Sequence, residues 1–285
     1  MTSLAQRRRR DKMMTGAMVA ALLVAIVPLG LILADVVAKG IGQLSLGFLT
    51  QPEPFVVTAS GGGFGAGIRG TIKMVALGTA IAVPIGVLAA VYLTEYRTRG
   101  PLAALVRFLA DVMTGIPSIF VGIFVFTAVV LETHSFSSWA GGLALGILML
   151  PVVVRTSEEA LLLVPTAIKE AALALGVRRW RTIVSVVLPT ALPGITTGAL
   201  LAVARAAGET APLLLTAFGN QLLTGWGSWN GPEASLTLQI FFDSRSPFPA
   251  QQARAWTGAL VLILGVLALS IAARAAIARR SRRAR

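Results

Sequence analysis

The sequence predicts an all-α polytopic membrane protein with six transmembrane helices. Composition is the first reason, because 55% of the 285 residues are hydrophobic and only 13% are charged, which gives a mean hydropathy of +0.80. The second reason is that several apolar runs exceed the roughly 20 residues that a helix needs to cross about 30 Å of hydrocarbon. A chain of this length and composition is too apolar for a water-soluble globular domain.

The expected spans are separated by polar loops and flanked by two basic tails. The first apolar run is longer than the roughly 7 to 15 residues of a signal-peptide core and shows no small-residue cleavage site, so we expect it to be retained. We divide the chain into a basic tail at 1–12, a six-helix membrane domain at 13–278 and a second basic tail at 279–285. The expected spans are approximately 13–37, 71–93, 111–130, 138–154, 189–218 and 255–277.

The distribution of Lys and Arg predicts the orientation of these spans. Net charge is +13, and nineteen of the 25 basic residues fall in the N-terminal tail, in the loops after the second and fourth spans, and from Arg274 onward. Basic residues concentrate on the cytoplasmic side, so we expect both termini in the cytoplasm. Orientation accounts for the positive charge, and no nucleic-acid partner is needed.

Arg107 and Asp111, four residues apart, are expected to pair at the start of the third span.

Several kinds of chemistry are excluded or disfavoured by the sequence. The chain has no Cys and a single His, His134, so disulfides and thiolate metal sites are ruled out and a His-based metal site or catalytic triad is improbable. Gly65, Gly67 and Gly70 match the dinucleotide pattern G-x-G-x-x-G, but no strand precedes them, and we expect a flexible hinge there. No Lys follows a Gly, so the chain lacks a Walker A lysine. We therefore expect no metal or cofactor in this chain, and any ATPase must be another polypeptide.

One stretch, Pro165 to Pro189, is too polar to span a bilayer yet lies between two spans. Pro165 can begin a short amphipathic helix and Gly176 can close it in the left-handed conformation, with a second helix running toward Leu188. The charge distribution places this stretch in the cytoplasm. It is either an ordinary helical loop or the rigid element through which a separate motor protein moves the membrane helices.

Two charged residues of the fifth span carry the strongest functional signal. Arg205 and Glu209 are one helical turn apart, and Arg205 lies about 24 Å along the helix from Pro189, at or beyond the middle of the membrane. An unpaired Arg at this depth costs about 2.5 to 3.5 kcal/mol. The pair either fixes helix packing or lines an ion pathway, and Gly208 and Pro212 would let this helix bend.

Two groups of motifs resemble known families. Glu170-Ala171-Ala172, Gly176 and Leu188-Pro189 resemble the EAA loop of bacterial ABC-importer permeases, with Val186 where Ile is usual. Three further stretches are similar to the PstA family of phosphate permease subunits, and the stretch 219–254 resembles that family less clearly. The three stretches are Gly70 to Tyr96, Asp111 to Ile119 and Arg205 to Thr210.

The resemblance implies a type I ABC-importer permease (MetI-like) fold in a multi-pass protein of the bacterial inner membrane. It implies phosphate import driven by ATP, with ATP and Mg bound by partner ATPase subunits. The implied partners are a homologous PstC-like permease, two PstB-like ATPases and an extracytoplasmic PstS-like phosphate-binding protein. The implied phosphate path contains Arg205, Glu209 and Thr210. The implied ATPase-coupling residues are Pro165, Glu170, Ala171, Ala172 and Gly176.

Three alternatives remain open at the level of the sequence. A permease for another oxyanion, sulfate or molybdate, would share the Gly-Glu pair of the fifth span, although Thr210 and the stretch 111–119 favour phosphate. A non-transporting membrane scaffold would require the EAA pattern to be coincidental. A secondary transporter would have only one mid-span acidic residue, Glu209, to relay protons.

Overall fold

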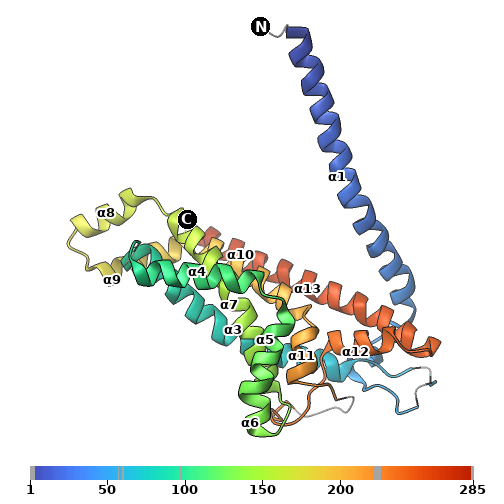
Figure 1. Cartoon of the computed structure of the whole chain (residues 1–285). Helices are drawn as coiled ribbons and strands as arrows, with labels where there is room; N and C mark the ends of the chain where they lie inside the picture. Colours follow the sequence, from blue (N-terminus) through green and yellow to red (C-terminus); the bar gives the residue numbers. More distant parts are fainter. Residues whose placement is uncertain (1–3, 57, 60, 97, 221–225, 284–285) are drawn as a thin grey trace.

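The computed structural model describes residues 4–56, 58–59, 61–96, 98–220 and 226–283, and these residues are almost entirely helical. Figure 1 labels the α-helices in chain order. The longer α-helices are α1 (Leu4–Gly40), α3 (Gly65–Val91), α4 (Pro101–Gly115), α7 (Ser138–Leu162), α10 (Leu188–Ala207) and α13 (Pro249–Arg283). The shorter ones are α2 (Leu46–Thr50), α5 (Ser118–Val125), α6 (Leu131–Thr133), α8 (Thr166–Ala174), α9 (Arg179–Thr182), α11 (Ala211–Thr216) and α12 (Leu236–Ser244). A 3-10 turn η1 (Ile41–Gln43) and the π turns η2 (Tyr92–Tyr96), η3 (Phe126–Val130) and η4 (Ile183–Val187) extend them.

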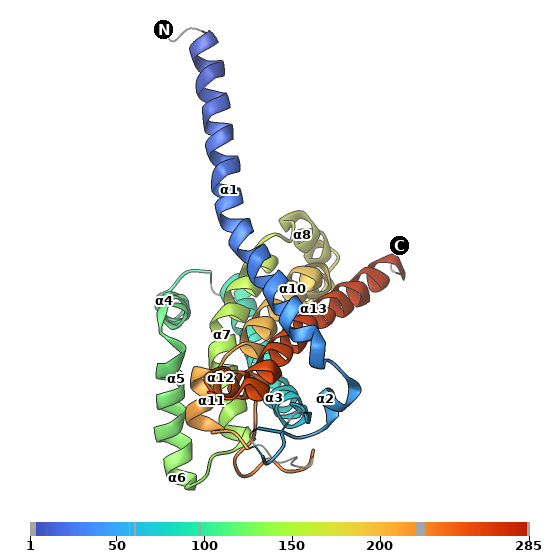
Figure 2. The same ribbon diagram turned by 90° about the vertical axis from the view of Figure 1, so that its right-hand side faces the viewer.

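The predicted class, an all-α polytopic membrane protein, is confirmed. Within the described residues, five helical segments are long and apolar enough to cross a membrane, and a bent pair brings the number to six. The five are Gln6–Gln43, Gly65–Tyr96, Ser138–Leu162, Arg179–Ala207 and Pro249–Ala275, and the bent pair is Pro101–Gly115 with Ser118–Thr133. Figure 2 shows both termini on the same half of the molecule as α8, with α6 at the opposite end. We call these the α8 end and the α6 end.

The third span differs from the sequence prediction. It is broken at Ile116-Pro117, where the two halves meet at an angle of 105°. The ring of Pro117 disfavours helical geometry at the preceding residue, and Ile116 is accordingly extended (ψ 130°). Asp111 therefore lies on α4, which packs along α7 through the buried residues Ala103 and Ala110. The second half of the bent pair, Ser118–Thr133, begins with α5 and continues to the α6 end of the molecule.

The fifth span begins ten residues earlier than predicted and ends earlier as well. One helical segment runs from Arg179 to Ala207, so the second helix expected within Pro165 to Pro189 is the start of a membrane span. The π turn η4 lies immediately before Pro189. Its wider hydrogen-bond register lets the helix continue past a residue that has no N–H to donate.

The core is formed by α3 and α10 packed against α7. A methyl group added at Gly78 of α3 would lie 3.0 Å from the amide nitrogen of Gly146, so small residues set this close approach. Buried apolar residues from all three helices fill the centre, among them Met74, Leu145, Met149, Val153, Ala202 and Val203. Membrane helices gain little from the hydrophobic effect among themselves, so this packing is a main source of their association.

Helix α1 leaves this core and projects away from it (Figures 1 and 2). None of its most apolar window is buried. Contact is made near its C-terminal end, where the hydroxyl of Thr257 donates to the carbonyl of Gly40 at 2.8 Å. Residues 4–12 of the expected basic tail form the first turns of α1, and residues 279–283 the last turns of α13. Residues 1–3 and 284–285 of the tails, and Arg97, lie outside the described residues.

The glycine-rich stretch 61–70 is not the flexible hinge that the sequence suggested. Helix α3 already begins at Gly65, and its early glycines admit close neighbours. The amide of Gly67 donates to Gln239 Oε1 at 3.0 Å, and a side chain at Gly70 would overlap the carbonyl of Ala234. These positions need glycine for close contact with the segment around α12.

A buried ionic cluster joins the loop after α2 to α12 and α13. Arg254 is 1% exposed; it donates to Asp243 Oδ2 at 3.3 Å and to the carbonyl of Ala59 at 3.0 Å. Burial, with the nearby charge of Asp243, raises the pKa of Glu53 to about 7, although Arg254 and the Gln239 side chain oppose the shift. Burial also raises the pKa of Asp243.

Stability should fall as pH rises through the range between the two pKa values of Glu53. The ordinary value is 4.5 and the value in the folded protein is about 7, so the folded state holds a proton that the unfolded state has released. The melting temperature of the purified protein should therefore be lower at pH 8 than at pH 5.5. Glu53→Gln, which mimics the protonated acid, should raise the melting temperature at pH 8 and leave it nearly unchanged below pH 4.5. Glu132→Gln, at an exposed position in α6, is the control, and a Glu53→Gln effect independent of pH would contradict this assignment.

Candidate functional site

The continuous helix that ends in α10 stops at Ala207, and a short non-helical segment, Gly208 to Thr210, separates it from α11. The amides of Gly208 and Glu209 donate back to the carbonyls of Arg205 and Ala206 at 3.0 and 3.2 Å. Thr210 is partly buried and occupies the N-cap position of α11. Two of the three pathway residues predicted from the sequence, Glu209 and Thr210, lie in this break, and Arg205 lies in the turn before it.

Contacts between α10 and α7 place this break along the bundle. A side chain at Gly194 would meet Ala160, and one at Gly198 would meet Thr156. Because the two helices run in opposite directions, Arg205 is level with about residue 149 of α7, whose bounds are Ser138 and Leu162. Arg205 therefore lies near the middle of the membrane-spanning part of α7. Non-helical backbone at such depth is tolerated where it is buried in protein or lines a cavity.

The charged groups at the break are only loosely paired. Arg205 Nε lies 3.8 Å from Glu209 Oε1, and the two side chains are 50% and 16% exposed. This distance is too long for a hydrogen bond, and within the described residues the Arg205 side chain makes none. Arg205 lies in the last turn of α10, where the helix dipole favours a cation. Thr237 of α12 fixes the backbone by donating its hydroxyl to the carbonyl of Glu209 at 2.7 Å.

The predicted coupling residues lie together at the α8 end. Pro165 occupies the N-cap of α8, as expected, and Glu170 and Ala171 are exposed while Ala172 is partly exposed. Gly176 is left-handed (φ 78°), which confirms the predicted helix stop. Its amide donates to Leu173 at 2.9 Å, and the amide of the next residue, Val177, donates to Ala172 at 3.2 Å, the two bonds of a Schellman cap.

Beside this cap, the turn between α8 and α9 exposes apolar and basic side chains together. Leu175 is 84% exposed and Trp180 57%. They line an open depression with the basic residues Arg178 and Arg181. Exposed apolar groups gathered next to charged ones are typical of a docking surface.

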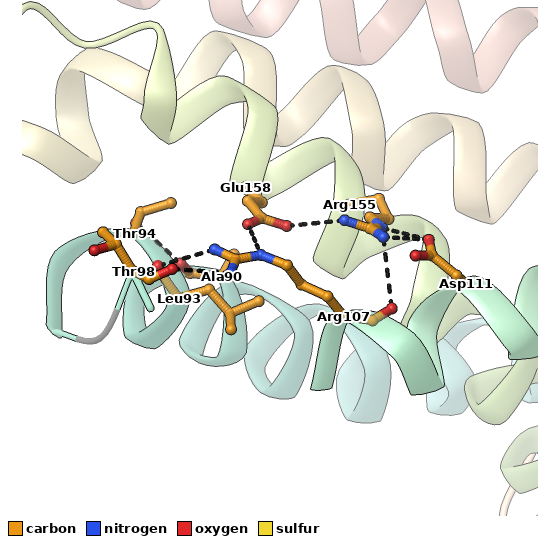
Figure 3. A network of polar contacts seen from close by, with 8 residues as sticks. All are labelled: Ala90, Leu93, Thr94, Thr98, Arg107, Asp111, Arg155 and Glu158. Atoms are coloured by element: carbon orange, nitrogen blue, oxygen red, sulfur yellow. Dashed lines mark hydrogen bonds and ion pairs between the residues drawn. The ribbon is translucent and has the colours of Figure 1, made fainter. Parts of the chain in front are cut away.

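The expected Arg107–Asp111 ion pair is wrong. Both residues lie on the face of α4 that meets α7, and each finds its partner there (Figure 3). Arg107 donates to Glu158 Oε1 at 2.7 Å, Arg155 contacts Glu158 Oε2 at 3.3 Å, and Arg155 also binds Asp111. A chain of four alternating charges thus fastens α4 to α7.

A further buried ion pair, Lys73 with Glu233, was not found by sequence reasoning. Lys73 Nζ lies 2.5 Å from Glu233 Oε2, and both side chains are at most 4% exposed. Ser138 donates to the same carboxylate oxygen at 3.0 Å, and Lys73 also binds the carbonyl of Ser228 and lies 5.3 Å from the ring of Trp229. The one available signal was a Lys just inside an apolar span. The cluster fastens the segment before α12 to the α6 end of α3 and α7.

No group of three or more Asp, Glu, His or Cys side chains within the described residues could hold a metal ion. The chemistry that the described site offers is thus a guanidinium with uncommitted donors at mid-span, beside one carboxylate. Such a group binds an oxyanion by charge and by paired hydrogen bonds.

Comparisons with known proteins agree with this fold. Residues 82–283 match the profile of the family described as "Binding-protein-dependent transport system inner membrane component". The chain belongs to this family of multi-pass membrane permeases.

Individual relatives within this family are phosphate transport permeases. The chain is 42% identical over 277 residues to the phosphate transport system permease protein PstA of Yersinia pestis, covering 97% of this chain and 92% of that protein. It is 42% identical to PstA of Haemophilus influenzae, covering 93% of each. It is 39% identical to PstA 1 of Mycobacterium tuberculosis, covering 94% of this chain and 88% of the relative.

Solved structures confirm the fold. A chain of the inward-facing MetNI methionine ABC transporter superimposes with a TM-score of 0.59 at 21% identity, covering 76% of this chain and 96% of that one. A chain of an amino acid ABC transporter gives a TM-score of 0.52 at 17% identity, covering 77% and 93%. The fold is therefore that of type I ABC-importer permeases, as predicted.

Lys73→Met should be strongly destabilising, by about 3 to 5 kcal/mol, because it leaves the Glu233 carboxylate buried without its cation. The double variant Lys73→Met/Glu233→Leu should recover much of this loss, since no buried charge then remains. Thermal and denaturant unfolding in one detergent would measure both. Lys39→Met removes an exposed partner of Asp35 and should change stability by less than about 1 kcal/mol. Equal losses of stability in the two Lys variants would show that the buried pair contributes no more to stability than the exposed pair.

Proposed function

We propose that this chain is a transmembrane subunit of an ATP-driven importer for inorganic phosphate and that it forms half of the translocation pathway. Identity of 42% to PstA proteins, extending over 97% of the chain, supports phosphate as the substrate. One structural observation carries the anion part of the proposal, namely a half-exposed Arg205 beside a helix break at mid-span. Two other oxyanions, sulfate and molybdate, are the alternative substrates to be tested.

Three residues at the break have distinct roles in this proposal. Arg205 offsets the charge of the passing anion and donates two hydrogen bonds from its planar guanidinium. Glu209 orients Arg205 and accepts a hydrogen bond from a protonated phosphate oxygen, which sulfate at neutral pH lacks. Thr210 contributes its hydroxyl at the start of α11. A site that requires a donor on the ligand rejects analogues without one.

Helix α8 is the docking element for a partner ATPase. Pro165 and the Gly176 cap give this helix fixed ends, and Glu170, Ala171 and Ala172 present its surface to the partner. The other members of the complex are a homologous permease, two ATPase subunits that bind ATP and Mg, and a phosphate-binding protein on the opposite side of the membrane. The α8 end, with both chain termini, faces the bacterial cytoplasm, because most basic residues lie there.

ATP binding then moves α8, and the helices attached to it open the Arg205 site to one side or to the other. Phosphate enters from the binding protein at the α6 end and leaves at the α8 end. A helix that is well packed transmits such a displacement because cores are not continuously deformable.

Arg205→Ala should reduce phosphate uptake by at least about 100-fold, since the passing anion loses its counter-charge at mid-membrane depth. Arg205→Lys should recover part of the uptake, because it keeps the charge but not the paired donors. Uptake of radiolabelled phosphate into proteoliposomes containing the whole complex measures this, with sulfate and molybdate as competitors. Arg274→Ala, at an exposed position near the end of α13, is the matched control. Normal uptake by Arg205→Ala would refute the role of Arg205.

Gly176→Val should uncouple the permease from its ATPase without preventing membrane insertion. A β-branched residue in the left-handed conformation costs about 1 to 2 kcal/mol, so the cap after α8 rearranges. Co-purification of the ATPase and ATP-dependent uptake should both fall, while the melting temperature of the permease changes little. Gly42→Ala, where an added methyl group meets nothing within 4 Å, is the control. Retained co-purification together with retained uptake would count against α8 as the docking element.

A further inference from the structure

Helix α8 is attached to the rest of the bundle by very few side chains. None of its residues is buried, and apart from the chain itself it has one polar connection. Lys169 Nζ lies 2.5 Å from Glu95 Oε1 at the end of α3. In the part of the chain that the structure describes, no other side chain of α8 makes a hydrogen bond or an ion pair. Within the described residues, this ion pair is therefore the direct polar link between the side chains of α8 and α3.

The position of Glu95 is fixed by the backbone of a π turn and by burial. It lies in the π turn η2 that ends α3, and π turns are frequent at functional sites. Glu95 is 8% exposed, so its carboxylate needs a cation close by. Next to it, the ring of Tyr96 receives the guanidinium of Arg179, from α9, at 5.4 Å. Both flanks of the α8–α9 turn thus reach the same short segment of α3.

The same segment is also held from the other side. Arg107 of α4 donates to the carbonyls of Leu93 and Thr98 at 3.3 and 3.0 Å and to Glu158 of α7 at 2.7 Å. Figure 3 shows the guanidinium of Arg107 between Glu158 on one side and the carbonyls of Leu93 and Thr98 on the other. Residues 92–96 are therefore contacted by side chains of α4, α8 and α9, and Arg107 links them further to Glu158 of α7.

We propose that Glu95 is a positioning residue for transport, which locks α8 to α3 through Lys169 so that displacement of α8 moves α3 and the tightly packed α7 with it. This inference rests on the proposed function, in which α8 receives the motion of an ATPase. With the ion pair removed, α8 stays attached by its two chain connections, and it tilts without carrying α3. ATP hydrolysis then continues while fewer anions cross the membrane for each ATP consumed.

The test uses the whole complex in proteoliposomes, with phosphate uptake and ATP hydrolysis measured in the same sample. Glu95→Gln should lower the number of phosphate ions taken up per ATP by about tenfold, equivalent to about 1.4 kcal/mol of lost coupling, while hydrolysis persists. The charge exchange Glu95→Lys/Lys169→Glu should restore the ratio to within about threefold of the wild type. Lys39→Gln, from the exposed pair with Asp35, should leave it unchanged.

Hydrogen exchange provides a readout that does not depend on activity. Amides of residues 166–174 should exchange faster in Glu95→Gln and in Lys169→Met than in the wild type, because α8 loses its link to α3. If the complex with Glu95→Gln does not assemble, the Lys169→Met variant is used in the uptake assay instead. An unchanged uptake ratio, or unchanged exchange in α8, would overturn the inference. A wild-type complex without phosphate-dependent uptake or hydrolysis would instead overturn the proposed function, and the exchange result would still decide the role of Glu95.

Discussion

Helices α3 and α7 approach each other so closely that a methyl group added at Gly86 would lie 2.7 Å from Val153 Cγ1. The spacing is set by small residues along the whole contact, and each end of the contact carries charges. Lys73 and Glu233 close the α6 end, and the chain of charges through Glu158 closes the α8 end. Because the two helices are fixed to each other, every element attached to either of them takes its position from this pair.

Several charges inside the helix bundle lie where burial makes pairing obligatory. Lys73, Glu95 and Glu158 are nearly buried, and each has an opposite charge within 2.7 Å. Breaking such a pair on one side leaves an uncompensated charge, which is far more costly than losing both members. Arg205 is the exception, since its partner lies 3.8 Å away and its side chain is half exposed. A loosely paired cation in the middle of a well-paired bundle is suited to bind a mobile anion.

The sequence allowed the membrane class, the number of spanning segments and the cap at Gly176 to be predicted, because each depends on residues near one another in the chain. Hydropathy over a window identifies a span, and a Gly after a short amphipathic helix identifies its end. Partners across helices could not be predicted. Arg107 has Asp111 one turn away in sequence but pairs with Glu158, and Glu233 is 160 residues from Lys73, so both pairings depend on how helices pack. The break before Pro117 and the π turn before Pro189 were also missed, since a Pro within an apolar run permits either a kink or a continuous helix.

A single helical segment connects the two regions to which function is assigned. It runs from Arg179, beside the cap of α8, to Ala207, two residues after Arg205, a length of about 40 Å at 1.5 Å per residue. Its middle is held against α7, where Gly198 lies close to Thr156, so a neighbouring helix supports the segment between its two ends. The segment ends at mid-span before the non-helical residues Gly208 to Thr210, where the carbonyl of Glu209 accepts a hydrogen bond from Thr237 of α12. In the proposed function, motion that enters at α8 reaches Arg205 along this segment, while the buried pair of Lys73 and Glu233 holds the α6 end.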